Sequence, residues 1–176
     1  MKRCKSHATI IMQKITPFLW FDDNNAEEAA KFYTSIFKKS KIRAITLHTK
    51  STSKSSGQPA NTVLTVEFDL EGQPFTALNG GSNFKFNESI SFVVRCKNQK
   101  ELDYYWKKLT SGGGKEVACG WLKDKFGVSW QIVPENIMDL ISSKHPEKAE
   151  RVMAAVMNMV KLDIKKLKAA YAGKTK

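Results

Sequence analysis

The stretch CGWLKDKFGVSWQIVP, residues 119–134, decides the fold that this sequence predicts. Within it, Val128, Trp130 and Ile132 alternate with Ser129, Gln131 and Val133, which is typical of a strand with one apolar face and one face lining a cavity. The preceding residues 124–127 predict a tight turn in which Gly127 supplies a positive φ angle. The stretch therefore predicts a β-hairpin whose two tryptophans fill either a buried core or the wall of a pocket.

Length and composition limit the kinds of protein that this chain can be. The 176 residues suit one domain or two small fused modules, and a hydrophobic content of 41% is enough for a buried core. No apolar run approaches the roughly 20 residues of a membrane span, and the N-terminal segment MKRCKSHATII lacks the pattern of a signal peptide. Cys4, Cys96 and Cys119 are scattered and odd in number. These features predict a cytoplasmic protein with reduced thiols and no membrane partner.

The chain is basic, with 29 lysines and arginines, 17 acidic residues and a net charge of +12. Its basic residues are spread along the sequence, and the richest segment, 161–176, is interpreted as the solvated face of a helix. Because no dense basic stripe with interleaved aromatic residues is present, we expect no specific nucleic-acid partner. Docking of another protein by these basic C-terminal helices is one alternative function.

The first half of the chain predicts one helix and four strands. Acidic residues open the helix, and Ala29, Phe32, Tyr33 and Ile36 fall on one of its faces. The polar segment TKSTSKSSGQPA at 49–60 predicts a mobile loop. The predicted elements are a strand at 15–21, a helix at 26–37 and strands at 42–48, 61–70 and 73–79.

The same order of elements returns in the second half. The pattern β-α-β-β-β therefore occurs twice, which we interpret as an internal duplication. Each unit is too small to bury a sheet face alone, so the two are expected to pack together. The predicted elements are a strand at 89–96, a helix at 98–109, a strand at 115–118, the hairpin, a helix at 136–141 and further helices between Pro146 and Gly173.

Five segments carry a resemblance to a known family: KITPFLWF, AEEAAKFY, FTALNGG, FNESISF and the hairpin. Together they resemble the PhnB-like proteins, also called the 3-demethylubiquinone-9 3-methyltransferase domain family, within the vicinal oxygen chelate superfamily of glyoxalases, dioxygenases and bleomycin-resistance proteins. The resemblance covers about residues 12–173. It implies an α+β fold of paired βαβββ modules with C-terminal helices, and a homodimer with cavities formed by the sheets.

The resemblance also divides the chain. It implies a flexible N-terminal arm at 1–11, a PhnB-like domain at 12–133 and a helical extension at 134–176. Within the domain, the two modules are expected at about 14–79 and 88–133.

Superfamily members hold a divalent metal through His and Glu side chains, and these positions can be compared one by one. The first His position falls near Phe18, the second on Ser89, the Glu position on Gln131 and the last near Asn79. Phenylalanine cannot bind a metal, and Ser and Gln are weak neutral ligands. None of the three histidines lies at these positions. We therefore expect no metal site of the superfamily type.

The methyltransferase in the family's name is not supported by a cofactor motif. A Rossmann domain that binds S-adenosylmethionine would carry a glycine-rich turn directly after its first strand. Here that strand ends in Phe21-Asp22-Asp23, and the glycines at 80–81 and 112–114 stand in other contexts. We therefore expect no cofactor.

The favoured function is binding of a small molecule in an aromatic pocket. Aromatic side chains would supply contact area, while amides would orient a polar ligand. A cationic ligand would require acids, which only Glu67, Asp69 and Glu88 offer nearby. The predicted ligand-binding residues are Phe18, Trp20, Asn79, Phe86, Trp106, Trp121 and Gln131.

An enzyme acting on an aromatic or quinone-like molecule is the second alternative. Cys119 would be its nucleophile, with Glu88 or Asp124 as acid or base. Each residue also has a structural interpretation, because Cys119 suits a small buried side chain, Asp124 suits a turn cap and Glu88 suits the start of a surface strand.

Overall fold

Eight strands within the described part of the chain form two separate sheets of the same topology. The computed structural model describes residues 13–142 and 144–174, and the chain divides into two units at 1–82 and 83–176. The strand order is β1-β4-β3-β2 in the first unit and β5-β8-β7-β6 in the second. The predicted α+β fold with a repeated βαβββ order is confirmed, whereas the predicted N-terminal arm lies outside the described residues.

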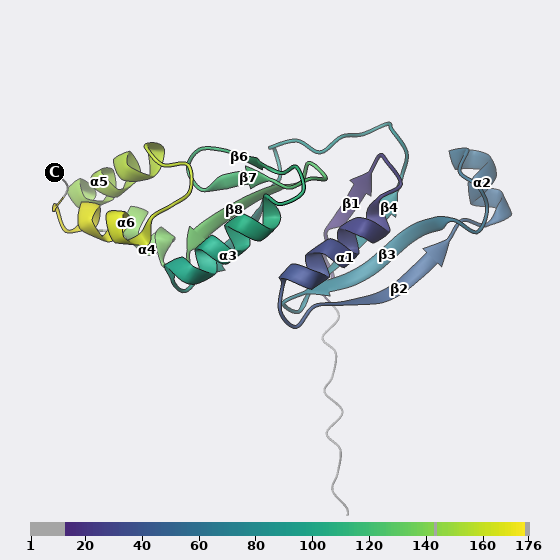
Figure 1. The fold of residues 1–176 in the computed structure, drawn as a ribbon, viewed down its shortest axis with the longest axis horizontal. Helices are drawn as coiled ribbons and strands as arrows, with labels where there is room; N and C mark the ends of the chain where they lie inside the picture. The colour runs from purple at the N-terminus through teal and green to yellow at the C-terminus, as the bar shows by residue number, and fades with distance from the viewer. Residues whose placement is uncertain (1–12, 143, 175–176) are drawn as a thin grey trace, which may run out of the picture. The chain divides into compact units, whose positions relative to one another are not determined.

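The first unit packs one helix on one face of its sheet (Figure 1). Alternation places Leu19, Phe68 and Ala77 on the covered face, where all three are buried. Tyr33 of the helix stacks near Phe68, with ring centroids 6.2 Å apart. The strands are β1 (Phe18–Phe21), β2 (Lys41–Leu47), β3 (Val63–Leu70) and β4 (Gln73–Asn79), and the covering helix is α1 (Ala26–Ile36).

The predicted loop at 49–60 is wrong over most of its length, because helix α2 (Lys50–Ser56) lies there. Thr49 caps its first turn, since the side chain of Thr49 accepts a hydrogen bond from the Thr52 amide and that of Thr52 accepts one from the Thr49 amide. Gly57 ends the helix in the left-handed conformation, with φ 73°. None of the helix's residues is buried. Local capping therefore specifies a helix that the hydrophobic pattern does not show.

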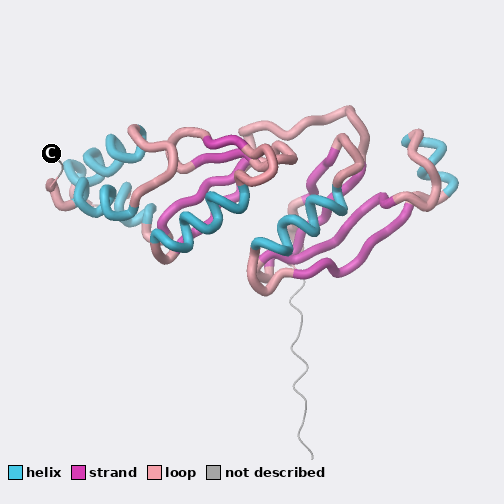
Figure 2. The backbone as a smooth tube through the Cα atoms, viewed as in Figure 1, coloured by secondary structure: helices cyan, strands magenta, loops and turns pink. Residues whose placement is uncertain are grey.

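The second unit repeats the arrangement around the hairpin. Phe92 of one neighbouring strand and Leu122 of the other both pair with Trp130. Leu122 and Trp130 are buried on the sheet that α3 contacts. Asn98 caps α3 by accepting a hydrogen bond from the Glu101 amide at 3.0 Å. The elements are β5 (Phe92–Cys96), α3 (Gln99–Leu109), β6 (Lys115–Glu116), β7 (Trp121–Lys123) and β8 (Ser129–Pro134) (Figure 2).

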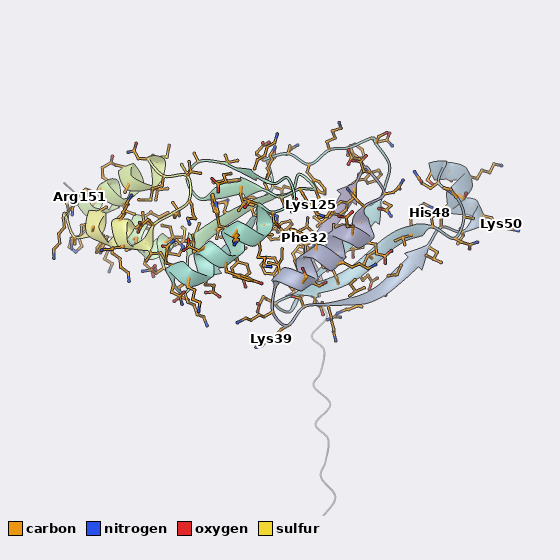
Figure 3. All side chains as sticks on the ribbon, viewed as in Figure 1. Phe32, Lys39, His48, Lys50, Lys125 and Arg151 are labelled. Atoms are coloured by element: carbon orange, nitrogen blue, oxygen red, sulfur yellow. The ribbon has the colours of Figure 1, made fainter. Side chains whose placement is uncertain are left out.

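Three C-terminal helices complete the second unit: α4 (Ile137–Ile141), α5 (Pro146–Met157) and α6 (Ile164–Tyr171). Arg151 of α5 (labelled in Figure 3) joins two of them, because its guanidinium donates to the carbonyls of Ala170 at 2.9 Å and Tyr171 at 3.2 Å. These carbonyls lie at the C-terminal end of α6, so a cation there is stabilising. None of the helices in the described residues has the length and apolar character that a bilayer span needs.

The extension is fixed to α3 by polar contacts. The side chain of Gln99 donates to the carbonyl of Leu162 at 3.1 Å and accepts from the amide of Ile164 at 2.9 Å. Lys161 forms an ion pair with Asp103 at 2.6 Å. This contact with Lys161, followed by a hydrogen bond from Gln99, holds the pKa of Asp103 below its usual value. The contribution of the pair to stability is therefore present above the usual pKa of Asp103 and is lost at acid pH.

Replacing Gln99 by alanine should weaken the second unit. Gln99→Ala leaves the Ile164 amide and the Leu162 carbonyl without their partner, which costs about 1–3 kcal/mol of unfolding free energy. Urea denaturation followed by circular dichroism measures the loss. The matched control is Lys100→Ala at the exposed neighbouring position, and equal midpoints for the two variants would contradict the prediction.

Candidate functional site

The face of the second sheet opposite Leu122 and Trp130 carries the candidate site. Gln131 of β8 pairs with Val93 of β5 on one side and with Trp121 of β7 on the other. Trp121 and Gln131 are half-buried, and Val93 is exposed. The amide nitrogen of Gln131 donates to the hydroxyl of Ser91 at 2.9 Å. A flat apolar surface and a neutral amide–hydroxyl pair therefore lie side by side.

Ser91 is a candidate site residue that the sequence interpretation missed. The comparison of metal positions selected Ser89, whereas the structure places Ser91 against Gln131, and the amide of Ser89 instead donates to Asn87 at 2.9 Å. Alternation along the segment was the available signal, because Ser91 shares a strand face with Val93.

Glu88 and Lys123 form an ion pair at the edge of this face. The hydrogen bond from Lys123 holds the pKa of Glu88 below its usual value. Glu88 is therefore ionised and paired, and a carboxylate in this state is a poor proton donor. Phe86 lies in the same connecting segment, and its Cβ is 3.9 Å from the position that a side chain at Gly127 would take.

Asp124 organises the turn of the hairpin. It is 3% exposed, and one carboxylate oxygen accepts from the amides of Phe126 at 2.9 Å and Val128 at 3.1 Å. The other oxygen accepts from the indole of Trp130 at 2.8 Å. Gly127 has the expected positive φ of 89°. The geometry matches the turn-capping interpretation of Asp124, and a catalytic role stays a prediction.

In the first sheet, Phe18 and Trp20 alternate with the buried Leu19 and Phe21. Phe18 is 60% exposed. The indole nitrogen of Trp20 donates to the carbonyl of Gly81 at 2.8 Å. A Cβ at Gly80 would lie 2.1 Å from the Trp20 ring, so glycine is required for this close approach. The two glycines after β4 therefore fix the orientation of Trp20.

Two predicted ligand-binding residues have structural partners. Asn79 is 4% exposed, and its amide accepts from the Ala26 amide at 2.9 Å and donates to the Val63 carbonyl at 2.9 Å. It therefore joins α1 to the sheet. Trp106 is 4% exposed among the buried residues of α3 and donates to Glu116. Each side chain is therefore bonded within its own unit.

The two described cysteines differ in environment. Cys96 is fully buried, and burial raises the pKa of its thiol from 9.0 to about 12. Cys119 is only partly buried, in the turn between β6 and β7, and its thiol donates to the sulfur of Met157 at 3.7 Å. Its contact is therefore with the C-terminal extension.

The residues at the superfamily's metal positions do not fit a metal. Phe18 has no donor atom, and the Gln131 amide is bonded to a neutral hydroxyl. Across residues 13–142 and 144–174, no three His, Cys, Asp or Glu side chains gather closely enough to hold an ion. His48 lies at the end of β2, beside α2 (Figure 3), and is 2% exposed. The absence of a metal remains a prediction.

The family model described as 3-demethylubiquinone-9 3-methyltransferase matches residues 13–133. The chain belongs to this family. Helices α4–α6 lie beyond the matched residues.

One of the similar solved structures bears the family's description. A putative 3-demethylubiquinone-9 3-methyltransferase, PhnB protein, from Bacillus cereus is 35% identical, with TM-score 0.60, covering 69% of this chain and 98% of that one. A Pseudomonas aeruginosa protein is 19% identical, with TM-score 0.51, covering 70% of this chain and 97% of that one. The fosfomycin resistance protein FosX from Listeria monocytogenes is 17% identical, with TM-score 0.45, covering 68% and 88%. No curated protein matches the chain.

Changing Asp124 to asparagine tests its role in this PhnB-like protein. Asp124→Asn is nearly isosteric but turns an NH₂ group toward an N–H donor, so a buried hydrogen bond to a charged group is lost. We expect a loss of about 2 kcal/mol of unfolding free energy, measured by urea denaturation. Asp23→Asn at an exposed position is the control. A stability equal to that of the parent chain would contradict the structural role.

Thiol reactivity should separate the two cysteines. In a Cys4→Ser background at pH 8, a disulfide reagent should label Cys119 and spare Cys96, whose pKa of about 12 keeps it protonated. In the unfolded chain the same thiol ionises near 9.0, so the unfolding free energy should fall as pH rises above 9. Mass spectrometry of the labelled peptides measures the selectivity, and rapid labelling of Cys96 would contradict it.

Proposed function

We propose that this protein binds an uncharged aromatic or quinone-like small molecule on the sheet face that carries Trp121 and Gln131. The observation that carries the proposal is the Gln131–Ser91 hydrogen bond beside a half-buried tryptophan. Within the described chain the amide oxygen of Gln131 accepts no hydrogen bond, so it can accept one from a ligand hydroxyl. Trp121 supplies a flat surface for the ring.

The charges on the face disfavour a cationic ligand. Glu88 already pairs with Lys123, and Arg95 lies on the same strand face as Val93. The hydroxyl of Ser129, on the same strand face as Gln131, is 2% exposed and has no partner among the described residues. A polar ligand or water would satisfy such a group.

We also propose that the protein is a homodimer without a resident metal. The methyltransferase in the family's name does not describe the proposed activity of this chain. Gln131 and Ser91 are neutral side chains, and the eight described strands form two four-stranded α+β units instead of one doubly wound sheet. Binding of S-adenosylmethionine by a Rossmann turn therefore has no counterpart in the described residues.

A thermal-shift panel tests the proposal. Hydroxylated aromatics and quinones should raise the melting temperature, whereas Mn²⁺, Ni²⁺, Zn²⁺ and S-adenosylmethionine should not. A ligand at 100 times its dissociation constant stabilises by about 2.7 kcal/mol, which corresponds to roughly 5–10 °C at this size.

Two alanine variants test whether the ligand binds on this sheet face. Gln131→Ala should abolish the shift, whereas Gln73→Ala, which removes a half-buried glutamine from β4, should retain it. A shift with a divalent metal would restore metal-assisted chemistry, and one with S-adenosylmethionine would support the family's name. A light-scattering mass near that of a single 19.9 kDa chain would contradict the dimer.

A further inference from the structure

Three sulfur-bearing side chains lie on one surface of the second unit. The thiol of Cys119 is 3.7 Å from the thioether of Met157, which is the last residue of α5. Met153 lies four residues earlier on the same helix and therefore on the same side of it. A cysteine from the family domain thus contacts Met157 of the extension, and Met153 lies one helical turn before it.

The backbone holds the two contributing segments together. The amide of Cys119 donates to the carbonyl of Met159 at 2.7 Å, and that of Gly120 donates to Val160 at 2.8 Å. Leu162 packs against Gly120, where an added Cβ would lie 3.0 Å from its side chain. The approach of Cys119 to Met157 is therefore fixed by adjacent backbone pairing and does not depend on side-chain flexibility alone.

The exposure of the two methionines argues against a role in core packing. Methionine normally fills gaps in an apolar interior, yet Met153 is 39% exposed and Met157 is 65% exposed. Within α5 only Val152 is buried. Both methionine side chains are therefore accessible to solutes.

We propose that Cys119, Met157 and Met153 bind a soft monovalent metal ion, Cu(I). Thiolate and thioether ligands select Cu(I) over harder ions. Two sulfurs 3.7 Å apart can both lie about 2.3 Å from one ion, as in zinc–sulfur bonds, with a near-tetrahedral angle between them. The thiol proton passes to solvent as the Cu–S bond forms, and copper enters and stays as Cu(I), so no oxidant or reductant takes part.

This site is separate from the proposed ligand face, since it uses none of its residues. It is also outside what the family supplies, because the family match ends at 133 and both methionines lie beyond it. The two proposals can therefore fail independently.

Competition for Cu(I) tests the site. The full chain carrying Cys4→Ser is titrated anaerobically with the Cu(I)–bathocuproine disulfonate complex, and the loss of the chromophore's absorbance measures transfer. We expect one equivalent to bind, at least tenfold weaker binding in Cys119→Ser, and several-fold weaker binding in Met157→Leu. Met138→Leu is the matched control, because it removes an exposed thioether from α4, and should bind as the parent does.

Several results would overturn the proposal: no transfer of Cu(I), undiminished binding by Cys119→Ser, or equal affinities of Met157→Leu and Met138→Leu. Zn²⁺ should not compete, and equally tight Zn²⁺ binding would contradict the selectivity. Cys119 has φ 61°, a conformation that glycine adopts readily. Cys119→Gly therefore provides a second thiol-free variant should the serine variant not fold, with circular dichroism as the check.

Discussion

The carboxylate of Asp124 is the constraint on which the second unit depends. This buried carboxylate accepts hydrogen bonds from two turn amides and from the Trp130 indole. Each of these donors would be costly to bury without a partner. Fixing the turn also fixes which residue of β7 faces which residue of β8. A shift of one residue in the pairing of β7 with β8 would move Trp121 and Gln131 to opposite sheet faces. The candidate site therefore depends on the single geometry of this turn.

Much of the fold was predictable from sequence because its elements follow hydrophobic periodicity. The two covering helices, the hairpin and the repeated order were predicted from spacing, and α1 and α3 differ from their predicted ranges by one residue at an end. Helix α2 was not predicted, because it buries nothing and depends on Thr49, Thr52 and Gly57. Such a helix is specified by caps, which a search for apolar stripes does not detect.

The candidate site was only partly predictable, because residue type does not reveal where a side chain's hydrogen bonds go. Asn79 and Asp124 were reasonable candidates by chemistry, yet their polar atoms bond to the protein's own backbone and indole groups. Ser91, an ordinary residue in sequence, becomes notable only because Gln131 reaches it. Tertiary geometry therefore divides the polar residues into those that hold the fold and those that remain available to a ligand.

The neutral amide of Gln131 limits the kind of ligand that the proposed site can select. A half-buried carboxylate needs a cation nearby to offset its desolvation, whereas a glutamine needs only hydrogen-bond partners, and Ser91 supplies one. Beside it, Glu88 pairs with Lys123. Arg95 lies two residues after Val93 on β5, so it belongs to the same sheet face. Selection among ligands in the proposed site would therefore depend on ring shape and hydrogen-bond geometry, with Arg95 disfavouring cations.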